Sequence, residues 1–351
     1  PAGAQLELRN RMDKLVKTCT FTAHNKPGCK TPTELTGYFE MVREKGVEIL
    51  PVLTTALTSS DPSMRQLAAY TLKLEGPGMM AKAAKKPDTL DDATARDLLA
   101  ALLHRNAVSL VPRDAIGTAI EAATIKNLND EALGLIRTYN PEERKAEVWV
   151  RAAGIERLMV HSRLKNFDFI KDTAKDSSQI ALQAAAFQAA WNMPGWSEEE
   201  SEAICNWAKE YVGARDDAKW KAMPARLLTR CNDHAKWDKV LLSEARERIK
   251  EGVYLRPFAD AINDMCKDRP AEIRDARQGT CADTRTLLED VVNANNLPPE
   301  ERAQALNAIG TIWQDDAAVA FVESKLESDV DLIKKYAKST ARKIEHRKKV
   351  K

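Results

Sequence analysis

The stretch that decides the fold runs from Val47 to Leu74 and reads VEILPVLTTALTSSDPSMRQLAAYTLKL. Apolar residues recur three and four positions apart in each half, which predicts two helices with one apolar face each. Between them, Asp61 can cap the second helix, and Pro62 suits its first position, where the missing N–H is not needed. The residues sharing a face are Val47, Leu50, Thr54 and Leu57, then Met64, Leu67, Ala68, Thr71 and Leu72. Because one such pair cannot bury both apolar faces, it needs similar pairs on either side.

Size and charge exclude several classes of protein. The chain has 351 residues, 44% of them hydrophobic, enough for two domains or one extended array with a large core. Fifty-four basic residues oppose 52 acidic ones, and the net charge of +2 does not favour nucleic acid as a partner. No apolar run approaches the roughly 20 residues of a membrane span. The chain begins PAGA rather than with Met, which suggests a removed upstream segment that was a signal, a lipid anchor or other tether, or a tag.

Six cysteines form three pairs that are close in sequence. We predict the disulfides Cys19–Cys29, Cys205–Cys231 and Cys266–Cys281. Disulfides imply an oxidising compartment, so we expect a periplasmic or secreted protein. The alternative is a cytoplasmic protein with six buried thiols. Zinc is disfavoured because the cysteines and histidines lack the clustering of zinc ligands.

Helices follow one another along the whole chain, and no strand pattern is present. We expect early helices at 4–18, 91–104, 113–126, 129–138 and 142–163. From residue 166 the expected pairs are 166–174 with 178–192, 197–212 with 217–231, 233–250 with 254–268, 281–294 with 299–313, and 315–327 with 331–346. The second helices start about 40 residues apart, which is a spacing typical of two-helix repeats.

Two Gly-Pro clusters, Gly76–Gly78 and Pro194–Trp196, should each end the helix before them, and each is a candidate bend between sub-arrays rather than a domain boundary. We divide the chain into an N-terminal helix with a cysteine loop (1–33), irregular helical repeats (34–165) and a continuous repeat array (166–351). The predicted class is all-α.

The helix pairs resemble HEAT repeats. Pro51 in the first helix, Asp61 in the turn and Arg65 early in the second, followed by Ala68, Ala69 and Leu72, match the usual pattern of that family. Partial matches occur at Asp176 and Asp331. The resemblance implies a right-handed α–α superhelix, a solenoid whose concave surface is lined by second helices and holds another macromolecule.

Catalytic constellations are missing from the sequence. One HEAT-like enzyme family uses paired His-Glu dipeptides, and none occurs here. The phosphate-binding glycine motifs and GxSxG are absent as well. Among five histidines, only His234 has a carboxylate at helical spacing, in Asp238, and that pair is typical of a surface contact. We therefore expect neither catalysis nor a cofactor or metal.

The expected partner surface lies on the second helices between about 178 and 268. Core-facing residues there should include Ile180, Phe187 and Trp191, which leaves a polar stripe for the groove. The stripe residues we single out are Gln183, Arg226, Arg230 and Asn263. This mixture suits a polypeptide, unless these are ordinary solvated positions.

Tryptophans crowd between Trp191 and Trp237, either as core residues or, at Trp196 or Trp237, as exposed anchors for a partner. The closing segment RKIEHRKKVK, from Arg342 to Lys351, is basic. It is either a solvated tail or a docking element for an acidic surface.

These patterns lead us to expect a non-catalytic protein–protein interaction scaffold in an exported or cell-envelope compartment. A cytosolic regulatory or assembly subunit of the same shape is the alternative. An all-helical enzyme with a site in the groove is a second alternative.

Overall fold

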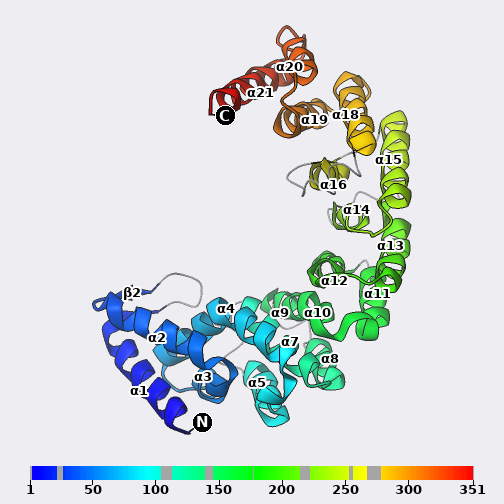
Figure 1. Cartoon of the computed structure of the whole chain (residues 1–351). Helices are drawn as coiled ribbons and strands as arrows, with labels where there is room; N and C mark the ends of the chain where they lie inside the picture. The colour runs from blue at the N-terminus through cyan, green and yellow to red at the C-terminus, as the bar shows by residue number, and fades with distance from the viewer. Residues whose placement is uncertain are drawn as a thin grey trace. The chain divides into compact units, whose positions relative to one another are not determined.

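The structure is a computed structural model that describes residues 2–21, 27–103, 113–138, 145–176, 178–213, 222–252, 256–266 and 278–350. The chain divides into two compact units, Pro1–Pro194 and Gly195–Lys351. The fold is all-α, as predicted, with one small hairpin (Figure 1). The division coincides with the predicted break at Pro194–Trp196. The expected boundary between 165 and 166 falls inside unit 1.

Unit 1 contains most of the short elements. They are α1 (Ala2–Thr18), β1 (Cys19–Thr20), β2 (Gly28–Cys29), α2 (Pro32–Lys45), the 3₁₀ turn η1 (Gly46–Ile49), α3 (Leu50–Leu57), α4 (Pro62–Lys85), η2 (Pro87–Thr89), α5 (Asp92–Leu103), α7 (Arg113–Ile125), α8 (Asn129–Thr138), α9 (Lys145–Arg157), α10 (Met159–Ser162), η3 (Arg163–Asn166), α11 (Phe167–Lys175) and α12 (Ile180–Asn192). Its second helices α4, α7, α9 and α12 pack side by side in that order, and we call them the second-helix row of unit 1 (Figure 1). The first helices α3, α5 and α8 form the other layer, and α11 packs on α12.

Unit 2 repeats this arrangement. Its helices are α13 (Glu198–Val212), α14 (Ala222–Leu228), α15 (His234–Glu251), α16 (Arg256–Cys266), α18 (Gln278–Asn293), α19 (Pro299–Ile312), α20 (Asp316–Glu323) and α21 (Asp331–Val350). The second-helix row of unit 2 is α14, α16, α19 and α21, and the first helices α13, α15 and α18 form the other layer (Figure 1). All five helix pairs predicted after residue 166 are present. They could be predicted because the sequence contains recognisable helix caps and helix-breaking residues.

Polar contacts between neighbouring repeats show the same period. They join residues separated by one repeat length, because each helix packs on its counterpart in the next pair. Examples and their separations are Arg157–Glu121 (36), Asn192–Glu156 (36), Arg248–Val212 (36), Arg226–Asp264 (38) and Lys343–Asn307 (36). Residues separated by the repeat length expected from the helix starts are therefore neighbours in space.

The turn of the Val47–Leu74 stretch has the predicted chemistry. The Asp61 carboxylate accepts a hydrogen bond from Ser63 N at 2.8 Å and caps α4. Arg65 reaches back over the turn and donates from Nη1 to the carbonyls of Ser59, at 2.6 Å, and Ser60, at 3.1 Å. Aspartate and arginine therefore fix this turn from both sides.

The predicted helix break at Gly76–Gly78 is wrong. Helix α4 continues through these residues to Lys85, with Pro77 exposed inside it. Gly76 lies against Thr118 of α7, and a Cβ at Gly76 would overlap the Thr118 hydroxyl. The glycine thus permits close packing of two second helices, which outweighs its low helix propensity.

The absence of strands was also an incorrect expectation. Cys19 pairs with Cys29, and Thr20 with Gly28, in a two-stranded antiparallel ladder. The alternation of apolar and polar residues cannot be recognised in strands of two residues, so the sequence carried no strand signal.

Candidate partner-binding surfaces

Gln183 does not lie on a groove surface, so its assignment as a partner-binding residue is corrected. It is buried, and its Nε2 donates to the carbonyl of Ala174 at 2.9 Å, near the end of α11. Carbonyls in the last turn of a helix lack intrahelical partners, and Gln183 satisfies one of them. Ile180, expected in the core, is 56% exposed instead. The two faces of α12 are therefore reversed relative to the prediction at these positions.

The predicted arginines of unit 2 both have partners within the protein. Arg226 Nε donates to Asp264 Oδ2 at 2.6 Å, which joins α14 to α16. Arg230 lies over the ring of Trp196, with its Cζ 4.6 Å from the ring centroid. Both arginines and Trp196 remain partly exposed, so their contact with a partner stays a prediction. Asn263 belongs to α16, but its side chain lies outside the described residues.

Trp237 is not an exposed anchor for a partner, so that alternative is wrong for this tryptophan. It is 1% exposed and lies on the first helix α15, among the largest fully buried side chains. Core packing, the first alternative, applies to Trp237.

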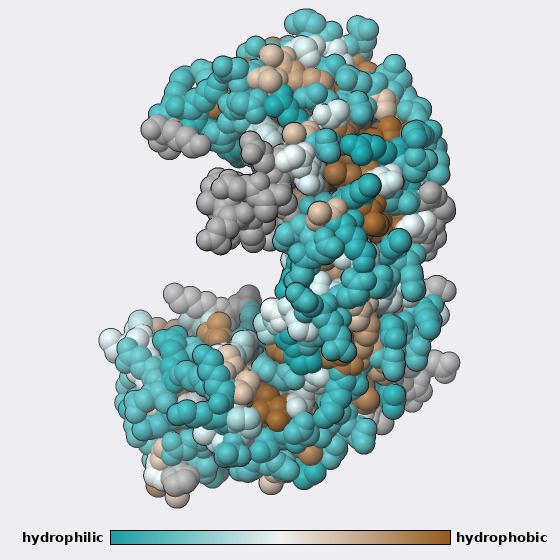
Figure 2. Space-filling view, turned by 45° about the vertical axis from the view of Figure 1, so that its right-hand side comes forward, coloured by the Kyte–Doolittle hydropathy of each residue, from teal (hydrophilic) through white to brown (hydrophobic). Residues whose placement is uncertain are grey.

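The second-helix row of unit 1 carries an unpredicted apolar surface. Trp149 on α9 is 61% exposed and Ile180 on α12 is 56% exposed, and these two helices pack side by side. Three further residues of α12 are half-buried, namely Ala181, Ala184 and Gln188. We call these five residues the Trp149 surface. Hydrophilic residues cover most of the face seen in Figure 2, and apolar residues form limited areas on it.

Three of the four large hydrophobic side chains that are exposed in the described part of the chain lie on this row: Leu74, Trp149 and Ile180. The fourth, Leu6, lies on α1. None of the described residues of the first helices α3, α5, α8 and α11 is of this kind. Exposed apolar residues gathered on one layer mark an interaction surface more often than scattered ones do.

Unit 2 exposes charge instead, along the last second helix. Residues spaced three and four apart line a shallow groove on one face of α21: Asp331, Lys334, Lys335, Lys338, Ser339, Arg342, Lys343, His346 and Arg347. Seven of these nine residues are Lys, Arg or His. The sequence reading drew attention to the segment from Arg342 onward, but the basic face begins two turns earlier.

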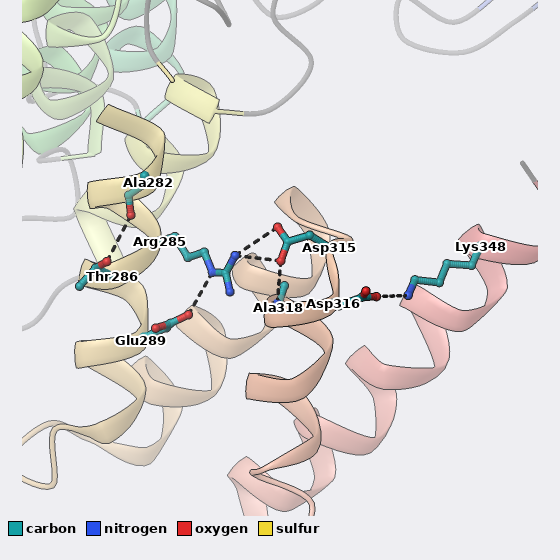
Figure 3. Close-up of polar contacts among 8 residues, drawn as sticks. All are labelled: Ala282, Arg285, Thr286, Glu289, Asp315, Asp316, Ala318 and Lys348. Atoms are coloured by element: carbon teal, nitrogen blue, oxygen red, sulfur yellow. Dashed lines mark hydrogen bonds and ion pairs between the residues drawn. The ribbon is translucent and has the colours of Figure 1, made fainter. Parts of the chain in front are cut away.

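A polar network fixes the first helix of the last repeat (Figure 3). Arg285 of α18 donates from Nη1 to both carboxylate oxygens of Asp315, at 2.9 and 3.1 Å, and from Nε to Glu289 at 3.0 Å. Asp315 also accepts from Ala318 N at 2.9 Å and so caps α20. Partial burial would raise the pKa of Asp315, but the Ala318 amide and the Arg285 charge outweigh it and hold that pKa below its usual value.

Sequence reasoning missed a charged cluster inside unit 1. Glu121 of α7 is 3% exposed and accepts from Arg157 Nε of α9 at 2.6 Å. Its other oxygen lies 2.9 Å from His161 Nε2 of α10. These residues are 36 and 40 positions apart, so no local spacing could have indicated them. Within the described ranges, no group of three His, Cys, Asp or Glu residues is placed to hold a metal ion.

The structure brings all three predicted cysteine pairs together as disulfides. Cys19 and Cys29 join the two strands of the hairpin, with Cα atoms 4.1 Å apart. Cys205 on α13 meets Cys231 just after α14, at 6.3 Å, and Cys266 on α16 meets Cys281 on α18, at 5.6 Å. The three pairs fit an oxidising, extracellular environment. Among the described helices, none is both long and apolar enough to span a bilayer.

Comparison with known proteins gives little further information. No protein-family model and no curated protein matches the chain. Among solved structures, human deoxyhypusine hydroxylase in complex with glycerol aligns over 98% of each chain, with 11% sequence identity and a TM-score of 0.30. A likeness this low assigns neither a family nor an activity to this chain, and the HEAT resemblance stays a prediction.

The expectation that the chain is not an enzyme is nevertheless corrected. The solved structure that aligns with the chain is that of an enzyme, which is the finding against this expectation. The missing motifs exclude particular chemistries only.

Proposed function

We propose that the protein is an interaction scaffold of the periplasm or the secreted space, built from HEAT-like repeats in a right-handed superhelix. It holds a protein partner along its second-helix rows. Three disulfides support the compartment, because such bonds persist where the environment is oxidising.

The observation that carries this proposal is the position of Leu74, Trp149 and Ile180, all exposed and all on the second-helix row of unit 1. A tryptophan can bury on the order of 150–250 Å² on binding and supplies a rigid anchor. Binding energy at protein interfaces is concentrated in few such residues. A polypeptide laid across α9 and α12 would therefore bury Trp149 and Ile180 together.

Mutation of the Trp149 surface tests the binding. The test variant combines Trp149→Ser and Ile180→Ser in one chain. The control variant is Leu6→Ser, because Leu6 is as exposed as Trp149, at 61%, but lies outside the row. A partner isolated from the native host with the wild-type chain should bind the double variant at least about 30-fold more weakly. The Leu6 variant should bind normally. Equal binding by the double variant, with its thermal unfolding unchanged, would refute the surface.

The cysteines test the compartment separately. Peptide mapping without reductant, on protein from its native host, should recover the three linked peptides. Six alkylatable thiols would contradict the exported compartment but leave the binding surface untouched.

A further inference from the structure

The exposed face of α21 carries basic side chains that have no internal role. Lys335, Lys338, Arg342 and His346 are spaced three and four residues apart and so form one straight stripe. All four are exposed, and within the described part of the chain no acidic side chain pairs with them. We call these four residues the α21 stripe.

The neighbouring basic residues of the same helix are used differently. Lys343 donates to Asn307 Oδ1 at 3.1 Å, Arg347 donates to the carbonyl of Thr311 at 3.0 Å, and Lys348 pairs with Asp316 at 3.5 Å (Figure 3). These contacts fix α21 against α19 and α20. Attachment of the helix therefore explains the basic residues beside the stripe and leaves the stripe itself unexplained.

Helix stability does not explain the stripe either. Cations are favoured in the last turn of a helix by its dipole, which suits Arg347, Lys348 and Lys349. Lys335 and Lys338 lie beyond the first turn of α21, where the helix dipole has little effect on a charge. Like charges three and four residues apart also repel each other by a few tenths of a kcal/mol per pair. The folded helix thus bears a small cost that a bound anion would remove.

We propose that the α21 stripe is the docking site of an acidic polypeptide segment. The stripe covers 11 residue steps, or about 16 Å along the helix at 1.5 Å per residue. Adjacent cations stand about 5–6 Å apart. Alternate side chains of an extended peptide repeat every 6–7 Å or so on one face, so about three carboxylates of a partner can lie opposite the stripe.

Other anionic partners fit less well. A helix that binds a membrane surface presents large apolar side chains beside its cations, and the exposed face of α21 offers Asp331 and Ser339 there instead. Nucleic acid binding draws on an extensive positive field, whereas the whole chain carries only +2. A short, local row of cations matches a short, local row of carboxylates.

Charge reversal on the full-length chain tests the site. The variant is Lys335→Glu with Lys338→Glu and Arg342→Glu. Its control is Lys209→Glu with Lys239→Glu and Arg246→Glu, which makes the same net change on exposed first-helix residues of the same unit. The probe is a fluorescent peptide with glutamate at every second position, and the matched glutamine peptide reports background binding. Heparin and phosphatidylserine vesicles are the competing anions.

The wild type and the control variant should bind the glutamate peptide alike, and added salt should weaken that binding. The stripe variant should bind it about tenfold or more weakly. Lys335→Gln with Lys338→Gln should give an intermediate loss, which keeps the test decisive if the charge-reversed variant folds poorly.

Equal weakening by the control variant would overturn the site, because it would show that only net charge matters. Preference of the wild type for heparin or vesicles over the peptide would overturn the acidic polypeptide. Because the stripe lies on unit 2, neither result bears on the Trp149 surface.

Discussion

The two units stack helix pairs in the same way but differ in their covalent links and in the burial of their ion pairs. In unit 2, two disulfides join neighbouring helical segments, at Cys205–Cys231 and Cys266–Cys281. In unit 1, the disulfide closes only the hairpin, while a buried carboxylate, Glu121, holds α7 to α9 and α10. The difference teaches that one repeat architecture tolerates either covalent or electrostatic links. Loss of the inter-helix disulfides should therefore destabilise unit 2, and loss of the buried ion pair should destabilise unit 1.

Loss of the inter-helix disulfides should have the largest effect and should be confined to unit 2. Loop entropy for sequence separations of 26 and 15 gives stabilisation of about 3.5 and about 3 kcal/mol. We expect Cys205→Ala with Cys231→Ala to raise hydrogen exchange throughout α13 and α14, with little change in unit 1. Cys19→Ala with Cys29→Ala is the matched control and should affect only the hairpin. Equal loss of protection in both units would break the comparison.

In unit 1, the substitution that corresponds to loss of a disulfide is removal of Arg157, which should lower the free energy of unfolding. Arg157→Met leaves the buried Glu121 carboxylate with His161 alone, and breaking a buried pair costs roughly 3–5 kcal/mol. Because Arg157 is 31% exposed, we expect a smaller loss of about 2–3 kcal/mol in the free energy of unfolding. The measurement is denaturant unfolding of the oxidised protein.

Arg96→Met provides the control for that change. Arg96 pairs with Glu131 across the same kind of repeat contact, but both side chains are largely exposed. Its loss should cost less than about 1 kcal/mol. Similar losses for both variants would mean that burial of Glu121 contributes nothing.

The smallest effect concerns acid pH and again separates the units. The folded-state pKa of Asp315 lies below the unfolded value of about 3.9, so its charge stabilises unit 2 above that pH. This contribution disappears as the pH falls through the folded-state pKa. Asp315→Asn keeps a capping side chain and should lose about 0.5 kcal/mol at neutral pH, and this difference should shrink as the pH falls below the unfolded-state pKa of about 3.9.

Asp91 offers the counterpart in unit 1. A hydrogen bond from the Thr94 amide holds the pKa of Asp91 below its usual value at the start of α5. Asp91→Asn should therefore change the acid sensitivity of unit 1 alone, as measured by hydrogen exchange between pH 3 and 7 or so. A shift of protection in unit 2 would contradict this assignment.

Particular residues show which surface features the sequence could not predict. Helix α12 is rich in alanine on all sides, so the apolar period could not decide between a core with Ile180 and a core with Leu182. The choice depends on α9 and α11, which pack on it and give Gln183 a carbonyl to bond. Trp237 was ambiguous for a different reason, because a tryptophan suits a protein core and a binding interface equally.

By itself, the sequence determined the helices, the repeat period and the three cysteine pairs. These features depend on local chemistry, namely caps such as Asp61, apolar spacing within one helix, and cysteines close enough in the chain to meet. Only the tertiary structure decided which face of each second helix is exposed, that α4 runs through Gly76, and that Glu121 meets Arg157. Those outcomes depend on contacts between residues about one repeat apart, whose side chains come together only when whole helices have packed.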